Sequence, residues 1–155
     1  MTATLLALAV LAQTTPVQPI VKGTALPPPD SIEGEVMAPV TALLAGFAAG
    51  DGAAVARQVR PDGAITTVAK AKAVTHAGWE DFARGLTPAT AFEVRLSRPA
   101  IEIDGDIAMV WAPYVLRIGG TMRNCGMSHF DLIRAGGAWK VLNLTSSART
   151  DDCGE

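Results

Sequence analysis

The chain contains no run of Lys or Arg, and its charged residues amount to 18% of the sequence with a formal net charge of −2. Recognition of nucleic acid, or of an anionic membrane surface by a polybasic segment, needs a concentrated positive face. We therefore expect no nucleic-acid partner and no electrostatic membrane binding. Reactive side chains are also scarce, because the sequence has only two His, two Cys and one Tyr.

Motifs that hold metals or phosphates are missing as well. His76, His129, Cys125 and Cys153 have no close spacing and make a poor ligand set, so we expect no metal and no cofactor. The glycine pairs at 119–120 and 136–137 are typical of hairpin turns, and neither opens a helix that could hold a phosphate. No motif in the sequence therefore indicates a particular reaction.

The chain does contain enough apolar residues for one folded domain, since 49% of its 155 residues are hydrophobic. Residues 1–12 are almost entirely apolar and match the length of a signal-peptide core, with cleavage expected after Ala12. No Lys or Arg precedes them, which leaves a buried or frayed N-terminal segment as the alternative. Residues 13–30 read as a Pro-rich linker, residues 31–150 as the domain and residues 151–155 as a C-terminal tail. We expect a periplasmic or secreted protein, with no membrane insertion of its mature form.

Helices precede strands along the domain. Ser31 and Asp51 are expected to cap a long helix ending at Gly50 and a short helix reaching Val59. A turn at 61–63, a strand at 64–69 and a third helix starting near Trp79 follow. Strands are then predicted at 92–97, 101–103, 107–118, 121–134 and 139–146. This order predicts an α+β fold in which N-terminal helices pack on the concave face of a curved antiparallel sheet of about four to six strands.

Three segments carry a resemblance to a known superfamily: Val110 to Tyr114, Asn124 to Leu132, and Trp139 to Thr145. They resemble the nuclear transport factor 2-like superfamily, in particular its small exported SnoaL-like and lumazine-binding-like proteins of unassigned function. The resemblance implies a cone-shaped sheet closed by helices, an internal apolar pocket and a homodimer formed through the outer sheet face. It covers roughly residues 31–150. Its members include enzymes and proteins without known chemistry, so it does not select an activity.

Strand pairing predicts which residues face the pocket. A two-residue turn at 119–120 and a three-residue turn at 135–137 would place Phe130 opposite Met109 and Leu142, and Ser128 opposite Trp111. Pro113 inside a strand favours a bulge or an edge position, and a bulge or a one-residue slip would exchange the two faces locally. The pocket candidates are Trp79, Met109, Trp111, Ser128, Phe130 and Leu142.

A second set of candidates is polar. In this register Tyr114, His129, Asp131 and Asn143 lie on the outer face, where a dimer would pack, with His129 opposite Asn143. A structural or interface role is therefore favoured over a pocket or catalytic one, although a His near an Asp can act as a general base. His76 precedes the third helix near the expected pocket mouth, where we favour a surface or capping role over ligand contact.

The two cysteines are predicted to form a disulfide that ties the C-terminal tail to the strand containing Cys125. The alternative is a redox or nucleophilic thiol, but Cys125 and Cys153 form no Cys-x-x-Cys motif that would lower a thiol pKa. An exported domain can keep such a bridge, so the pair and the apolar N-terminus support the same location.

Three functions remain open. The first is an exported, non-catalytic domain that binds a small apolar molecule in its cone, because the predicted pocket face carries no carboxylate. The second is a small hydrolase, isomerase or dehydratase acting on a hydrophobic substrate, which requires His76, Glu80, His129 or Asp131 to point inward. The third is a dimeric interaction module whose sheet face matters more than its pocket. We favour the first.

Overall fold

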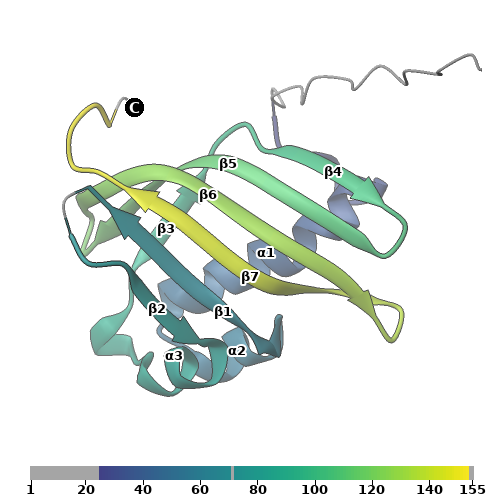
Figure 1. The fold of residues 1–155 in the computed structure, drawn as a ribbon, viewed down its shortest axis with the longest axis horizontal. Coiled ribbons are helices and arrows are strands. Elements are labelled where there is room, and N and C mark those ends of the chain that lie inside the picture. The colour runs from purple at the N-terminus through teal and green to yellow at the C-terminus, as the bar shows by residue number, and fades with distance from the viewer. Residues whose placement is uncertain (1–24, 71, 154–155) are drawn as a thin grey trace, which may run out of the picture.

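A computed structural model describes residues 25–70 and 72–153, so the predicted signal peptide at 1–12 and most of the predicted linker lie outside the described residues. Three α-helices lie on one side of a strongly curved sheet (Figure 1). The longest helix, α1, runs beneath the sheet, with α2 and α3 beside one of its ends. This two-layer arrangement confirms the predicted α+β class.

The long helix begins and ends at its predicted capping residues, whereas the short helix ends at Ala56 rather than at Val59. A strand starts at Val59 and runs through the turn predicted at 61–63. Helix α1 (Ile32–Ala49) has the side chain of Ser31 accepting a hydrogen bond from the Gly34 amide at 3.0 Å. It ends at Gly50, whose φ of 66° is a left-handed conformation favoured by glycine. Helix α2 (Gly52–Ala56) is capped by Asp51, which accepts from the Ala54 amide at 2.9 Å. Helix α3 (Trp79–Gly85) is followed by a 3₁₀ turn, η1 (Pro88–Thr90).

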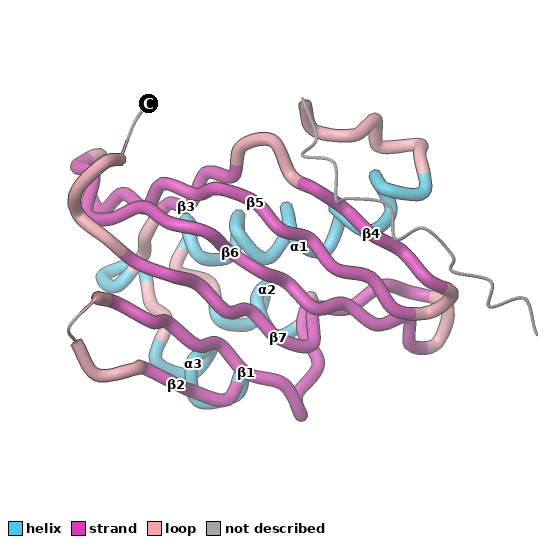
Figure 2. The backbone as a smooth tube through the Cα atoms, turned by 45° about the horizontal axis from the view of Figure 1, so that its top comes forward, coloured by secondary structure: helices cyan, strands magenta, loops and turns pink. Residues whose placement is uncertain are grey.

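Seven strands form one sheet within the described residues, in the order β2-β1-β7-β6-β5-β3, with β4 also paired to β5 (Figure 2). This is more than the predicted four to six. The additional strand is β2, and β1 pairs with β7 in parallel, so the sheet is not purely antiparallel. The strands are β1 (Val59–Ala69), β2 (Thr75–Gly78), β3 (Glu93–Leu96), β4 (Ala100–Asp104), β5 (Ile107–Ile118), β6 (Thr121–Ala135) and β7 (Ala138–Ala148).

The core fills the space between α1 and the concave face of the sheet. Along the helix, buried residues recur at the spacing of one helical face: Val36, Val40, Leu43 and Phe47. The sheet meets this face with alternate residues of its long strands, which point to one side because side chains alternate along a strand. These are Ala108, Val110, Phe130, Leu132, Val141 and Leu144.

The predicted register was wrong for β5. The 119–120 turn does pair Ile118 with Thr121, but a bulge at Leu116/Arg117 shifts every later pair by one residue. Phe130 therefore lies opposite Val110 rather than Met109, and Ser128 lies opposite Ala112 rather than Trp111. Because a one-residue shift exchanges the two faces of a strand, Val110 and Tyr114 face the core, whereas Met109 and Trp111 face outward.

A second difference lies in β7. The turn after β6 has two residues, so Ala135 pairs with Ala138, and an irregularity between Asp131 and Leu132 follows. As a result Phe130 lies opposite Leu144, not Leu142. His129 lies opposite Thr145, and Asn143 faces Asp131 instead.

The C-terminal segment is fixed to the start of β6. A disulfide joins Cys125 to Cys153, with 5.6 Å between the two Cα atoms. The backbone of Arg149 also exchanges two hydrogen bonds of 2.9 Å with that of Cys125. The tail expected at 151–155 is thus held against the sheet as far as Cys153.

Candidate functional site: the cone cavity

A cavity of about 180 Å³ lies inside the cone, between the helices and the concave side of the sheet. Helix α1 contributes Phe47 and α3 contributes Phe82, whose rings meet edge to face at 5.3 Å between centroids. Phe92 stacks on Phe47 at 5.0 Å, so three aromatic rings close the helical side. The remaining walls are Leu44, Ile65, Thr67, Val94, Tyr114, Leu116, Asn124, Ser128, Phe130, Leu144 and Ser146.

The polar side chains that line the cavity are uncharged, and several of them are hydrogen-bonded. The Tyr114 hydroxyl contacts Asn124 Oδ1 at 2.8 Å and the Ser147 carbonyl oxygen at 2.9 Å. The hydroxyls of Ser128 and Ser146 share a hydrogen bond of 2.9 Å. Burial raises the pKa of Tyr114, and the positive charge of Arg149 acts against this rise to a smaller extent. Tyr114 is therefore a neutral hydrogen-bonding group at physiological pH.

The lining includes no carboxylate and no histidine among the described residues. Abstraction of a proton from a bound molecule needs a general base within hydrogen-bond reach, and hydroxyls and an amide do not supply one. Nor does any group of three or more His, Cys, Asp or Glu in the described part of the chain have the geometry to hold a metal ion. The cavity can enclose an apolar group and offer it weak polar contacts.

Two of the predicted pocket residues line the cavity, and the others do not. Ser128 and Phe130 line the cavity, whereas the residues next to them along β6 do not. Met109 and Trp111 lie on the outer face, with Trp111 40% exposed, because Arg123 is an extra residue in β6 and shifts the register of β5 by one. Trp79 is 1% exposed and packs in the core, where its ring meets Phe82 at 5.9 Å.

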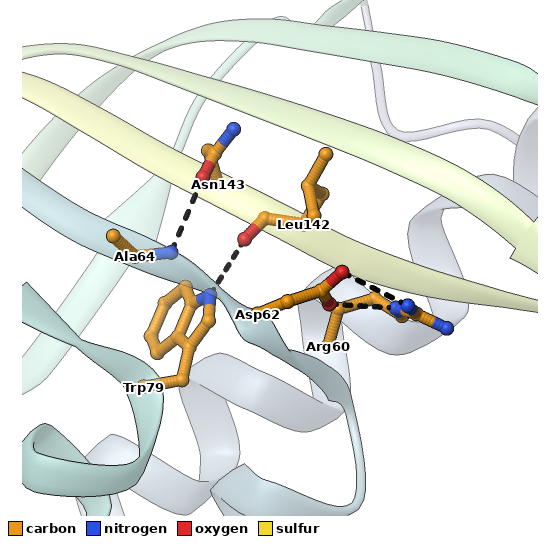
Figure 3. Close-up of polar contacts among 6 residues, drawn as sticks. All are labelled: Arg60, Asp62, Ala64, Trp79, Leu142 and Asn143. Carbon is orange, nitrogen blue, oxygen red and sulfur yellow. Dashed lines mark hydrogen bonds and ion pairs between the residues drawn. The ribbon is translucent and has the colours of Figure 1, made fainter.

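Leu142 and Asn143 have structural roles at an irregular junction between β1 and β7 (Figure 3). The Trp79 indole donates a hydrogen bond to the Leu142 carbonyl oxygen at 2.7 Å. Asn143 Oδ1 accepts from the Ala64 amide at 3.2 Å, which replaces a regular ladder bond at this point. A Cβ at position 63 would overlap the Leu142 carbonyl, so Gly63 permits the close approach.

The other polar candidates lie outside the cavity. His129 and Asp131 are neighbours on the outer face, with 3.5 Å between Nε2 and Oδ1, and the Trp111 ring lies 5.8 Å from that of His129. His76 is exposed on β2, where its Nδ1 is 2.9 Å from Thr66 Oγ1. It lines a neighbouring hollow of about 190 Å³ that shares Ile65, Thr67 and Phe82 with the cavity. Tyr114 is the one polar candidate that the structure brings inside.

Sequence reasoning missed the residues that helices and loops contribute. Leu44, Phe82 and Phe92 line the cavity but are not among the predicted pocket residues, because periodicity does not say where a helix docks on a sheet. Asn124 was noted only within the resemblance. Its alternation with Gly126 and Ser128 along β6 is the available signal, since Asn124 pairs with Leu116 on the same side of the register shift as Ser128.

Comparison with known proteins identifies solved structures with a similar fold. No family model matches the chain, and no curated protein matches it. Among solved structures, a protein of unknown function with a cystatin-like fold from Nostoc punctiforme has a TM-score of 0.63 at 13% identity, covering 77% of this chain and 92% of that one. A putative calcium/calmodulin-dependent protein kinase II association domain from Xanthomonas campestris has a TM-score of 0.62 at 22% identity, with coverages of 87% and 99%.

A third similar structure, from Novosphingobium aromaticivorans, is described as a nuclear transport factor 2-like protein with a cystatin-like fold. It is 16% identical, covers 77% of this chain and 83% of its own, and has a TM-score of 0.58. The chain thus has the cone-shaped α+β fold of the nuclear transport factor 2-like proteins, which confirms the resemblance at the level of the fold. Several of these neighbours have no known function, so the fold does not supply an activity.

Proposed function

We propose that this chain is an exported binding domain that encloses a small apolar molecule in its cone cavity. The observation that supports this best is the cavity itself, which is lined by aromatic and aliphatic side chains and by a few mutually bonded hydroxyl and amide groups. Ligand pockets typically combine an apolar lining with a small number of polar groups that fix orientation. The absence of an acid or histidine from the described lining favours binding over proton transfer.

The size of the cavity limits what it can enclose. A dry apolar cavity of roughly 150 Å³ admits a benzene molecule, and this one measures about 180 Å³. The enclosed part of the ligand is therefore expected to be one ring or a short alkyl chain. A larger molecule would have to extend beyond the cone.

A cavity-filling substitution tests this function. Ile65→Phe adds bulk to the cavity wall on β1, whereas Val68→Phe adds the ring at an exposed position of the same strand. Binding of 1-octanol and toluene would be measured by calorimetry and native mass spectrometry. We expect binding to the wild type and to Val68→Phe, and at least tenfold weaker binding to Ile65→Phe. No binding to the folded wild type would refute the function.

We also propose that two copies associate through the outer face of the sheet. Ile107 is 60% and Trp111 40% exposed there. Ile107 also lines an open groove of about 420 Å³ with Met109, Ile133 and Leu142, and the groove carries the carboxylates of Glu102, Asp104 and Asp131. Exposed apolar patches of this kind often mark protein interfaces. Light scattering at micromolar concentration should show a dimer. Trp111→Lys should give a monomer, while Ile32→Lys, a change at an exposed apolar residue of α1, should not.

Export is the third part of the proposal. It is supported by the Cys125–Cys153 disulfide, which persists in oxidising compartments, and by the apolar residues 1–12. Within the described residues, one helix, α1, is long and apolar enough to cross a membrane by length and composition, and its buried side packs against the sheet. Expression of the full chain in a bacterial host, followed by fractionation and intact mass, tests the proposal. A mature mass lacking the first residues in the periplasmic fraction supports export, and a full-length cytosolic product contradicts it.

A further inference from the structure

A second hollow, of about 510 Å³, lies where β1 ends, β6 begins and the chain leaves β7. We call it the cationic cleft. Four of its lining residues are basic and one is acidic, and they come from three parts of the chain that the fold brings together: Lys70, Lys72, Arg123, Arg149 and Asp151. The sequence has no run of Lys or Arg and did not predict this positive cluster.

These four cations are not used in ion pairs within the described residues. Elsewhere Arg60, Arg84 and Arg95 each contact a carboxylate at 2.9 Å or less. In the cleft, the Arg149 guanidinium makes a long contact of 3.4 Å to the Asp152 carbonyl oxygen, and no carboxylate of the described residues lies within 4.0 Å of any of the four. Like charges gathered without partners repel one another and attract an anion.

The cationic cleft and the cone cavity adjoin. Thr67 on β1 and Asn124 on β6 line both hollows. Asn124 also contacts Tyr114 inside the cone at 2.8 Å. Arg149 lines the cleft, and its positive charge lowers the pKa of Tyr114, although burial raises that pKa by more. An apolar site and a positively charged site therefore share a wall.

We propose that the ligand is an amphiphilic anion, with its ring or short alkyl chain in the cone cavity and its acidic head in the cationic cleft. This inference rests on the proposed function and adds the class of ligand to it. A carboxylate is the simplest head of this kind, and Arg and Lys bind carboxylates through charge-assisted hydrogen bonds. Thr67 and Asn124 lie at the junction between the two parts.

The test compares two probes that differ in the head alone, octanoate and 1-octanol, by calorimetry on the oxidised full chain. Octanoate should bind the wild type about tenfold or more tightly than octanol at low salt, and this advantage should shrink in 0.5 M NaCl as charges are screened. Arg123→Glu should weaken octanoate binding about tenfold and leave octanol binding unchanged. The matched control is Arg57→Glu, the same charge change at the end of α2, which should affect neither probe.

Four outcomes would overturn the inference, and they separate it from the proposed function. If octanol binds and octanoate binds no more tightly, the anionic head is wrong and the apolar cavity function stands. If Arg57→Glu weakens octanoate as much as Arg123→Glu, net charge rather than the cleft is responsible. If octanoate binds Ile65→Phe as well as it binds the wild type, the chain of the ligand is not in the cone. If neither probe binds, the proposed function fails with the inference.

Discussion

Tyr114 is the only tyrosine in the chain, so its ionisation can be followed directly by absorbance. Burial raises its pKa above the ordinary value of about 10, and the charge of Arg149 opposes that rise. We expect tyrosinate absorbance in the folded protein to appear at a higher pH than in urea. Arg149→Gln should raise the Tyr114 pKa further, whereas Arg57→Gln should not change it.

The sign of the effect on stability follows from linkage. Because the folded state holds the Tyr114 proton more tightly than the unfolded state, its contribution to stability is complete below the unfolded pKa of about 10. That contribution is lost as the pH rises through the folded pKa. Urea unfolding of wild type and Tyr114→Phe at pH 8 and above pH 10 would measure it. A wild-type protein that loses no more stability than Tyr114→Phe in this window would contradict the prediction.

Gly126 is a position in the sheet where an added side chain should be costly. It lies opposite Tyr114, and a Cβ there would overlap the Ser147 carbonyl oxygen, the same atom that accepts from the Tyr114 hydroxyl. Gly126→Ala is expected to lower the free energy of unfolding by about 2 to 4 kcal/mol, measured in urea. Gly85→Ala, in α3 with open space around it, is the control and should be neutral or stabilising. If Gly126→Ala and Gly85→Ala change the free energy of unfolding equally, the overlap at position 126 is relieved without loss of stability.

At the scale of elements, the starts of the first two helices and the positions of β3 to β7 were predictable because capping residues and alternation are local signals. The start of β1 at Val59 and the short strand β2 were not predicted. Ser31, Asp51 and Gly50 fulfil the expected capping roles. Register was not predictable for β5, since Pro113 suggested the wrong place for the bulge. Pro113 is in regular register opposite Met127, and it faces the break between β3 and β4, where Ser97 donates to its carbonyl oxygen. Proline has no backbone N–H to donate, and a strand tolerates this at a break between its neighbouring strands.

The disulfide is the element-scale feature with the largest expected effect on stability. It closes a loop with a sequence separation of 28, for which the chain-entropy model gives about 3 to 4 kcal/mol. Cys125→Ala/Cys153→Ala should lower the free energy of unfolding by about that amount in urea. Reduction of the wild type with dithiothreitol should give the same value. A much smaller loss would mean that the two hydrogen bonds between Cys125 and Arg149 hold the segment alone.

For the whole molecule, the sequence predicted the cone and part of its lining, but not the combination of sites around it. Ser128 and Phe130 could be assigned from the alternation of β6. The cationic cleft could not, because Lys70, Arg123 and Arg149 are far apart in the sequence and meet only when β1, β6 and the segment after β7 pack together. Local patterns describe elements, whereas a site between elements depends on how they dock.

The disulfide connects these sites at the level of the whole molecule. It holds residues 149–151, which form one wall of the cationic cleft, but contributes nothing to the helical side of the cone cavity. Reduction should therefore weaken octanoate binding several-fold by loosening the position of Arg149, and should leave octanol binding unchanged. Calorimetry of oxidised and reduced protein, with circular dichroism to verify folding, measures this. If both probes weaken equally, the disulfide maintains the cone as a whole; if neither weakens, the cleft is held in place without it.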